Sequence, residues 1–124
     1  MSQNSTQIEK LEEIVQLSIL YDFYGELLSA HKKQIFEDYI LNDLSLGEIA
    51  EEQGISRQGV YDIVRRCSKE LRDYESKLSL ARKFQTVKDK LNSIKEIISD
   101  TKSTGELARI SEIETLTEDI IKEL

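Results

Sequence analysis

Apolar side chains recur every three or four residues along most of the chain, which is the spacing of an amphipathic helix. The expected helices cover residues 8–28 (as one helix or two), 29–41, 46–53, 57–98 with a bend, and 106–123. The chain contains no proline and only 5 glycines in 124 residues. Few helix breakers and many good helix formers agree with the periodicity and predict an all-α protein.

The apolar positions after residue 60 form two stripes whose phases differ. Val60, Val64, Cys67, Leu71, Tyr74 and Leu78 make the first stripe, and Leu80, Phe84, Val87, Leu91, Ile94 and Ile98 make the second. Each stripe has alternating spacings of four and three residues, and the step from Leu78 to Leu80 breaks the phase. We therefore expect a bend within residues 76–81, a polar linker over 101–105, and a last helix with Leu107, Ile110, Ile113, Leu116 and Ile120 on its apolar side.

The stretch SLGEIAEEQGISRQGVYDIVRR, residues 45–66, has the features of a helix-turn-helix. Ala50 is small where two helices should cross closely, and Gly54 suits the left-handed backbone at a helix end. Ile55, Val60 and Val64 should hold the second helix in place. Ser56 is the expected hydroxyl cap of that helix, and Ser29 the cap of the helix over 29–41. The expected domains are a helix-turn-helix bundle over 1–74, with its motif at 46–72, and a helical hairpin over 75–124.

Charge is distributed unevenly, and the basic part coincides with the second helix of this motif. Residues 57–90 hold 10 basic and 5 acidic side chains, whereas the whole chain has a net charge of -7. The candidate nucleic-acid contacts are Arg57 and Gln58 for base edges, Arg65, Arg66, Lys69 and Arg72 for phosphates, and Tyr61 and Asp62 on the same face or its flanks. The alternative is a solvated surface on which Arg65, Arg66 and Lys69 pair with Glu70 and Asp73.

Two segments resemble known families. LSAHKKQIFEDYILNDLSLGEIAEEQGISRQGVYDIVRR is similar to region 4 of sigma factors. LYDFYGELL, the motif itself and LRDYESKLSL together resemble the YlxM family of small bacterial helix-turn-helix proteins, over roughly residues 17–100. The resemblance implies a sigma region 4-like helix-turn-helix bundle that binds DNA, and a link to the signal recognition particle pathway. The basic second helix favours a regulatory protein that binds DNA. The particle's RNA or its GTPase is therefore an alternative partner, and a protein adaptor with no nucleic-acid ligand is a third hypothesis.

The long apolar stripes in the second half need something to cover them. The last helix could fold back on the 80–98 helix, and a second copy could cover what remains exposed. We expect a homodimer with Phe84, Val87, Leu91, Ile94 and Ile98 in or beside the interface. Such a dimer would present two reading helices to a two-fold site.

The residues give no indication of catalytic chemistry. His31 is the single histidine and Cys67 the single cysteine, so no disulfide within the chain and no cysteine-based metal site is expected. No glycine-rich phosphate loop is present. We expect a non-enzyme without cofactor, metal or small-molecule substrate. The first residues lack the pattern of a secretion signal and no stretch has the length of a membrane span, so a cytoplasmic location is expected.

Overall fold

The computed structural model describes residues 2–105 and 109–124, and every regular element within these ranges is helical. The helices are α1 (Ser2–Tyr24), a 3-10 turn η1 (Gly25–Leu27), α2 (Ala30–Ile40), α3 (Leu46–Gln53), α4 (Arg57–Leu78), α5 (Leu80–Thr104) and α6 (Ile110–Glu123). They form two compact units, one ending at Ser79 and the other beginning at Leu80. The prediction of an all-α helix-turn-helix bundle is confirmed.

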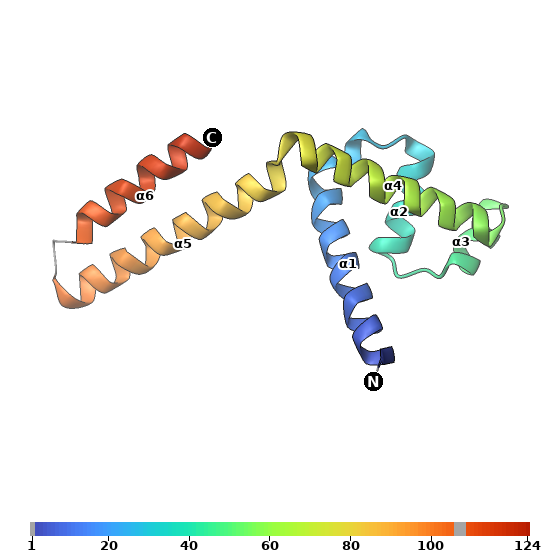
Figure 1. Ribbon diagram of the computed structural model, residues 1–124, viewed down its shortest axis with the longest axis horizontal. Helices are drawn as coiled ribbons and strands as arrows, with labels where there is room; N and C mark the ends of the chain where they lie inside the picture. Colours follow the sequence, from blue (N-terminus) through green and yellow to red (C-terminus); the bar gives the residue numbers. More distant parts are fainter. Residues whose placement is uncertain (1, 106–108) are drawn as a thin grey trace. The chain divides into compact units, whose positions relative to one another are not determined.

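The first unit is built around α4, against which α1, α2 and α3 all pack (Figure 1). Val60, Val64, Cys67 and Leu71 form the buried face of α4. The other buried apolar residues of this core are Leu17, Tyr21, Tyr24, Leu28, Ile35, Phe36, Ile40, Ile49 and Ala50. The first predicted stripe therefore reaches the core through Leu71, becomes half-buried at Tyr74 and is exposed at Leu78.

A bend was expected within residues 76–81. The structure has a break there between two separate helices, α4 and α5. Ser79 adopts a left-handed backbone with φ 54° and ends α4, and α5 begins at the next residue. A left-handed residue cannot continue a right-handed helix, and a serine adopts this conformation at some energetic cost.

The second unit is a hairpin in which α6 packs against α5, as expected for the last helix. Ile97 is the most buried apolar residue of α5, although it lies outside the predicted stripe. Within that stripe Val87 and Ile94 are half-buried, whereas Phe84, Leu91 and Ile98 remain exposed. The hairpin therefore buries one edge of the stripe and leaves the other edge exposed.

Three local predictions from the sequence were wrong or fall outside the described residues. The polar linker begins later than expected, because residues 101–104 continue α5 and the helix ends before Gly105, whose φ is 70°. Within this last turn the Ser103 hydroxyl donates to the Ser99 carbonyl at 3.1 Å, a bond that a helical backbone allows. Ser29 begins α2 without a capping hydrogen bond to its side chain. Leu107 lies outside the described residues, and the last helix is described from Ile110.

Burial raises the pKa of the Cys67 thiol from 9.0 to about 11, and this makes the core sensitive to alkaline pH. Because the folded-state pKa is the higher one, the associated stability is present below pH 9 and is lost as the pH rises toward 11. Two units of pKa correspond to about 2 to 3 kcal/mol. We expect the unfolding free energy, measured by urea titration, to fall more between pH 9 and 11 than that of Cys67→Ala. Parallel pH profiles of the two proteins would contradict this.

Ser56 and Ser29 provide a matched pair for the energy of a hydroxyl cap. Both begin helices from an extended backbone, but only the Ser56 hydroxyl accepts a hydrogen bond, from the Gly59 backbone N–H at 3.0 Å. We expect Ser56→Ala to lower the unfolding free energy by about 1 kcal/mol. Ser29→Ala should change it by less than about 0.5 kcal/mol. Equal losses in the two variants, read from urea unfolding curves, would show that the cap bond is not the cause.

Candidate nucleic-acid interface

The turn between α3 and α4 is held by hydrogen bonds within the motif. Gly54 ends α3 with φ 67°, and the Ile55 N–H donates to the Ala50 carbonyl at 3.1 Å. At the start of α3, Ser45 and Glu48 form a reciprocal capping box. Ile49 and Val60 are fully buried on the facing sides of the two helices. The angle between α3 and α4 is therefore set by packing and by satisfied backbone groups, which orients the outer face of α4.

Three basic side chains on the outer face of α4 are exposed to solvent. Arg65, Arg66 and Lys69 are all exposed, and none of them takes part in an ion pair within the part of the chain that the structure describes. Together with Asp62 they line a shallow hollow of about 330 Å³. The alternative pairing with Glu70 and Asp73 is not among the ion pairs of the described residues. The Glu70 carboxylate accepts a hydrogen bond from the Tyr74 hydroxyl at 3.4 Å.

The residues expected at base edges are positioned by neighbouring side chains. The Gln58 amide donates to the Asp62 carboxylate at 3.1 Å, one helical turn further along α4. The Arg57 guanidinium lies against Gly47 of α3, where an added Cβ would come within 3.0 Å of its Nε and Nη2 atoms. Gln58 and Asp62 thus share the exposed face, whereas Arg57 is turned toward α3.

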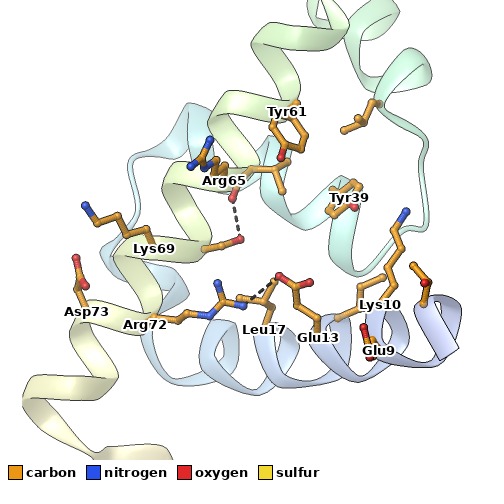
Figure 2. Close-up of a pocket in the computed structure, with 15 residues that line it drawn as sticks. Glu9, Lys10, Glu13, Leu17, Tyr39, Tyr61, Arg65, Lys69, Arg72 and Asp73 are labelled. Atoms are coloured by element: carbon orange, nitrogen blue, oxygen red, sulfur yellow. Dashed lines mark hydrogen bonds and ion pairs between the residues drawn. The ribbon is translucent and has the colours of Figure 1, made fainter. Parts of the chain in front are cut away.

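A groove of about 780 Å³ lies between α1 and α4, beside this outer face (Figure 2). Tyr61, Arg65, Lys69 and Arg72 line its α4 side. Val64, Ser68 and Asp73 of the same helix also line the groove, and the remaining lining residues are Thr6, Glu9, Lys10, Glu13, Ile14, Leu17, Tyr39 and Leu46. The groove therefore combines an apolar floor with charged rims of both signs.

An ion pair across the groove joins its two walls. The Arg72 guanidinium donates to the Glu13 carboxylate at 3.1 Å, and both side chains are about half exposed (Figure 2). A second link joins the same two helices, since the Tyr24 hydroxyl donates to the Glu75 carboxylate at 2.6 Å. Of the expected phosphate contacts, Arg72 is thus the one whose charge is already balanced by another helix.

The sequence did not indicate that α1 borders this site. Glu9 and Glu13 lie about sixty positions before Arg72 in the chain, and their spacing is that of an ordinary solvated helix face. Asp38 was also overlooked; it is buried, and its carboxylate accepts hydrogen bonds from the side-chain amides of Gln34 and Asn42 at 3.2 and 2.9 Å. The Asp38 contacts are local, one helical turn to either side, whereas the approach of Glu13 to Arg72 across the fold leaves no periodic signal in the sequence.

The described residues contain no group of three or more histidine, cysteine, aspartate or glutamate side chains placed to share a metal ion. Among the same residues, no helix combines the length and hydropathy required of a membrane span.

Comparison with known proteins identifies the chain's relatives. Residues 11–111 match the family model described as "Putative helix-turn-helix protein, YlxM / p13 like". A UPF0122 protein of Thermoanaerobacter sp. (strain X514) is 44% identical over 104 residues, covering 82% of this chain and 89% of the relative. The UPF0122 protein YlxM of Bacillus subtilis (strain 168) is 43% identical over 102 residues, covering 82% of this chain and 93% of the relative.

Proposed function

The chain belongs to the YlxM / p13-like family of helix-turn-helix proteins, UPF0122, and we propose that it binds duplex DNA through the outer face of α4 as a regulatory protein. The matched region includes the whole motif and α5. A helix-turn-helix places its second helix in the major groove, with the N-terminal part of that helix toward the base edges. Duplex DNA as the ligand agrees with the expected cytoplasmic location.

The observation that carries the proposal is the group of exposed cations Arg65, Arg66 and Lys69. They lie on the second helix of the motif, and no ion pair with the described residues neutralises them. A chain with net charge -7 has no general attraction for polyanions, so a local basic face is needed for approach to DNA. Phosphate contacts from these three side chains would orient α4 along the major groove of the DNA.

Gln58 and Asp62 are the proposed base-reading residues. A glutamine amide can bind both exposed edge groups of adenine, and a carboxylate can accept from the amino group of cytosine. The hydrogen bond between Gln58 and Asp62 orders both side chains before DNA arrives. It also directs part of the Asp62 charge toward Gln58, which reduces the repulsion that this carboxylate would exert on phosphate.

We further propose that the protein acts as a homodimer through the exposed edge of α5. Phe84, Leu91 and Ile98 are all exposed in the hairpin, and Val87 and Ile94 lie half-buried beside them. A two-fold dimer would carry two copies of α4 and recognise a two-fold site. The resemblance to YlxM proteins also implies signal recognition particle RNA as a competing ligand, which the binding experiment can compare directly.

Reversal of the exposed charges should abolish most of the binding. We expect Arg65→Glu/Arg66→Glu to weaken binding to random-sequence duplex DNA by at least about tenfold, and to lower the slope of log affinity against log salt by about 2. Fluorescence anisotropy titrations at several salt concentrations measure both quantities. Lys77→Glu/Lys122→Glu, which changes net charge equally at two residues outside the proposed contact set, should bind almost as the unmodified protein does.

Two results of these titrations would contradict the proposal. Equal losses in both double variants would mean that net charge alone governs binding. Tight, salt-sensitive binding to signal recognition particle RNA with none to duplex DNA would replace DNA by RNA as the ligand.

Removal of the Glu13 charge should strengthen nucleic-acid binding, because it leaves Arg72 available to a phosphate. We expect Glu13→Gln to steepen the salt dependence by about one phosphate contact. Glu118→Gln, the same charge change on α6, serves as the control. An affinity and salt slope equal in the two variants, measured by the same titration, would show that Arg72 does not reach the DNA.

A further inference from the structure

α1 carries apolar residues on two opposite sides. Leu17 and Tyr24 are buried on the side that faces the core of the first unit. Ile8, Leu11, Val15 and Ile19 form a line on the other side, which we name the α1 outer stripe, and each is between 47% and 63% exposed. Helices with apolar residues on both sides are normally covered on both sides, so this stripe indicates a docking surface.

α5 carries a comparable line. Phe84, Leu91 and Ile98 are spaced seven residues apart and form the α5 outer stripe, with Leu91 53% and Ile98 42% exposed. A seven-residue spacing keeps one line of side chains on the same side of a helix, as in helices that pack along their length against a partner. Lys88, Lys95 and Lys102 repeat with the same spacing, one turn after each apolar residue, and all three are exposed.

The charges beside the two stripes have opposite signs. Glu12 and Asp22 are exposed on α1 at positions that a helical wheel places beside its outer stripe. Lys10, the one basic residue of α1, lines the groove between α1 and α4 and does not border the outer stripe. On α5, the acidic residues Asp89, Glu96 and Asp100 fall on a different side of the helical wheel from the lysines that border the outer stripe.

These charges discriminate between the possible pairings of the two stripes. Two α5 stripes brought together would place lysines against lysines, and two α1 stripes would place carboxylates against carboxylates. Pairing of α1 with α5 places carboxylates against lysines. Exposed ion pairs add little affinity, but the repulsion in the wrong pairings contributes to the choice of partner, while burial of the apolar side chains supplies the attraction.

We propose that the α1 outer stripe of one copy docks on the α5 outer stripe of a second copy, and that the reciprocal contact closes a two-fold dimer. The inference rests on the proposed dimerisation and identifies the surface of the second copy that α5 contacts. A closed two-fold arrangement forms the contact twice, which doubles the apolar area buried. Glu12 and Asp22, which lie beside the α1 outer stripe, would thereby contribute to dimerisation and not to the groove between α1 and α4.

The test uses the full chain and two variants at exposed positions. Leu11→Lys places a positive charge on α1 opposite the lysines of α5, and Leu91→Glu places a negative charge on α5 opposite the carboxylates of α1. Each variant alone should raise the dimer dissociation constant by about tenfold or more, measured by light scattering over a concentration series. Circular dichroism and the melting temperature check that each variant folds.

Mixing the two variants provides the decisive measurement. One contact of the mixed dimer is unmodified, and the other places the introduced lysine of one variant against the introduced glutamate of the other. The mixture should therefore form dimers at a concentration where each variant alone is monomeric. If Leu11→Lys dimerises as the unmodified protein does, α1 is not in the interface, and the proposed dimer stands through α5 alone. A monomeric unmodified protein would overturn both the dimer and this interface, while the anisotropy titrations would still test nucleic-acid binding separately.

Discussion

Burial of one stripe of α4 is the constraint on which the first unit depends. Val60, Val64, Cys67 and Leu71 lie between α4 and the three helices that pack on it, and three of these four side chains are completely buried. Because successive residues of a helix turn by a fixed angle, the inward direction of this stripe determines which residues face outward. The outer face that carries Arg65 and Lys69 is therefore held in position by the core itself.

α1 adds an electrostatic element that a minimal helix-turn-helix lacks. Its Glu13 pairs with Arg72, and its inner side forms one wall of the groove beside the candidate interface. Both members of that pair are about half exposed, and pairs of this kind contribute at most about 1 kcal/mol. In the proposed complex with DNA, a phosphate would displace the carboxylate without a large penalty, so α1 would weaken binding without preventing it.

Local features were predictable because neighbouring residues determine them. The bounds of α3, the left-handed Gly54 and the Ser56 cap all follow from short-range backbone chemistry, and the structure has each of them as expected. The linker was misplaced because threonine, lysine and serine are compatible with a helix as well as with a loop. Ile97 was missed because periodicity finds an apolar line but does not indicate which of its edges a neighbouring helix will cover.

The sequence by itself determined the helical fold, the motif and the concentration of basic residues on its second helix, since each depends on residues within a few turns of one another. Tertiary structure alone decided which of those cations remain exposed and which is paired. It also placed α1 beside the groove. The physical reason is that ion pairs and docking surfaces depend on distances across the fold, and residues 59 positions apart, such as Glu13 and Arg72, meet only after the core has formed.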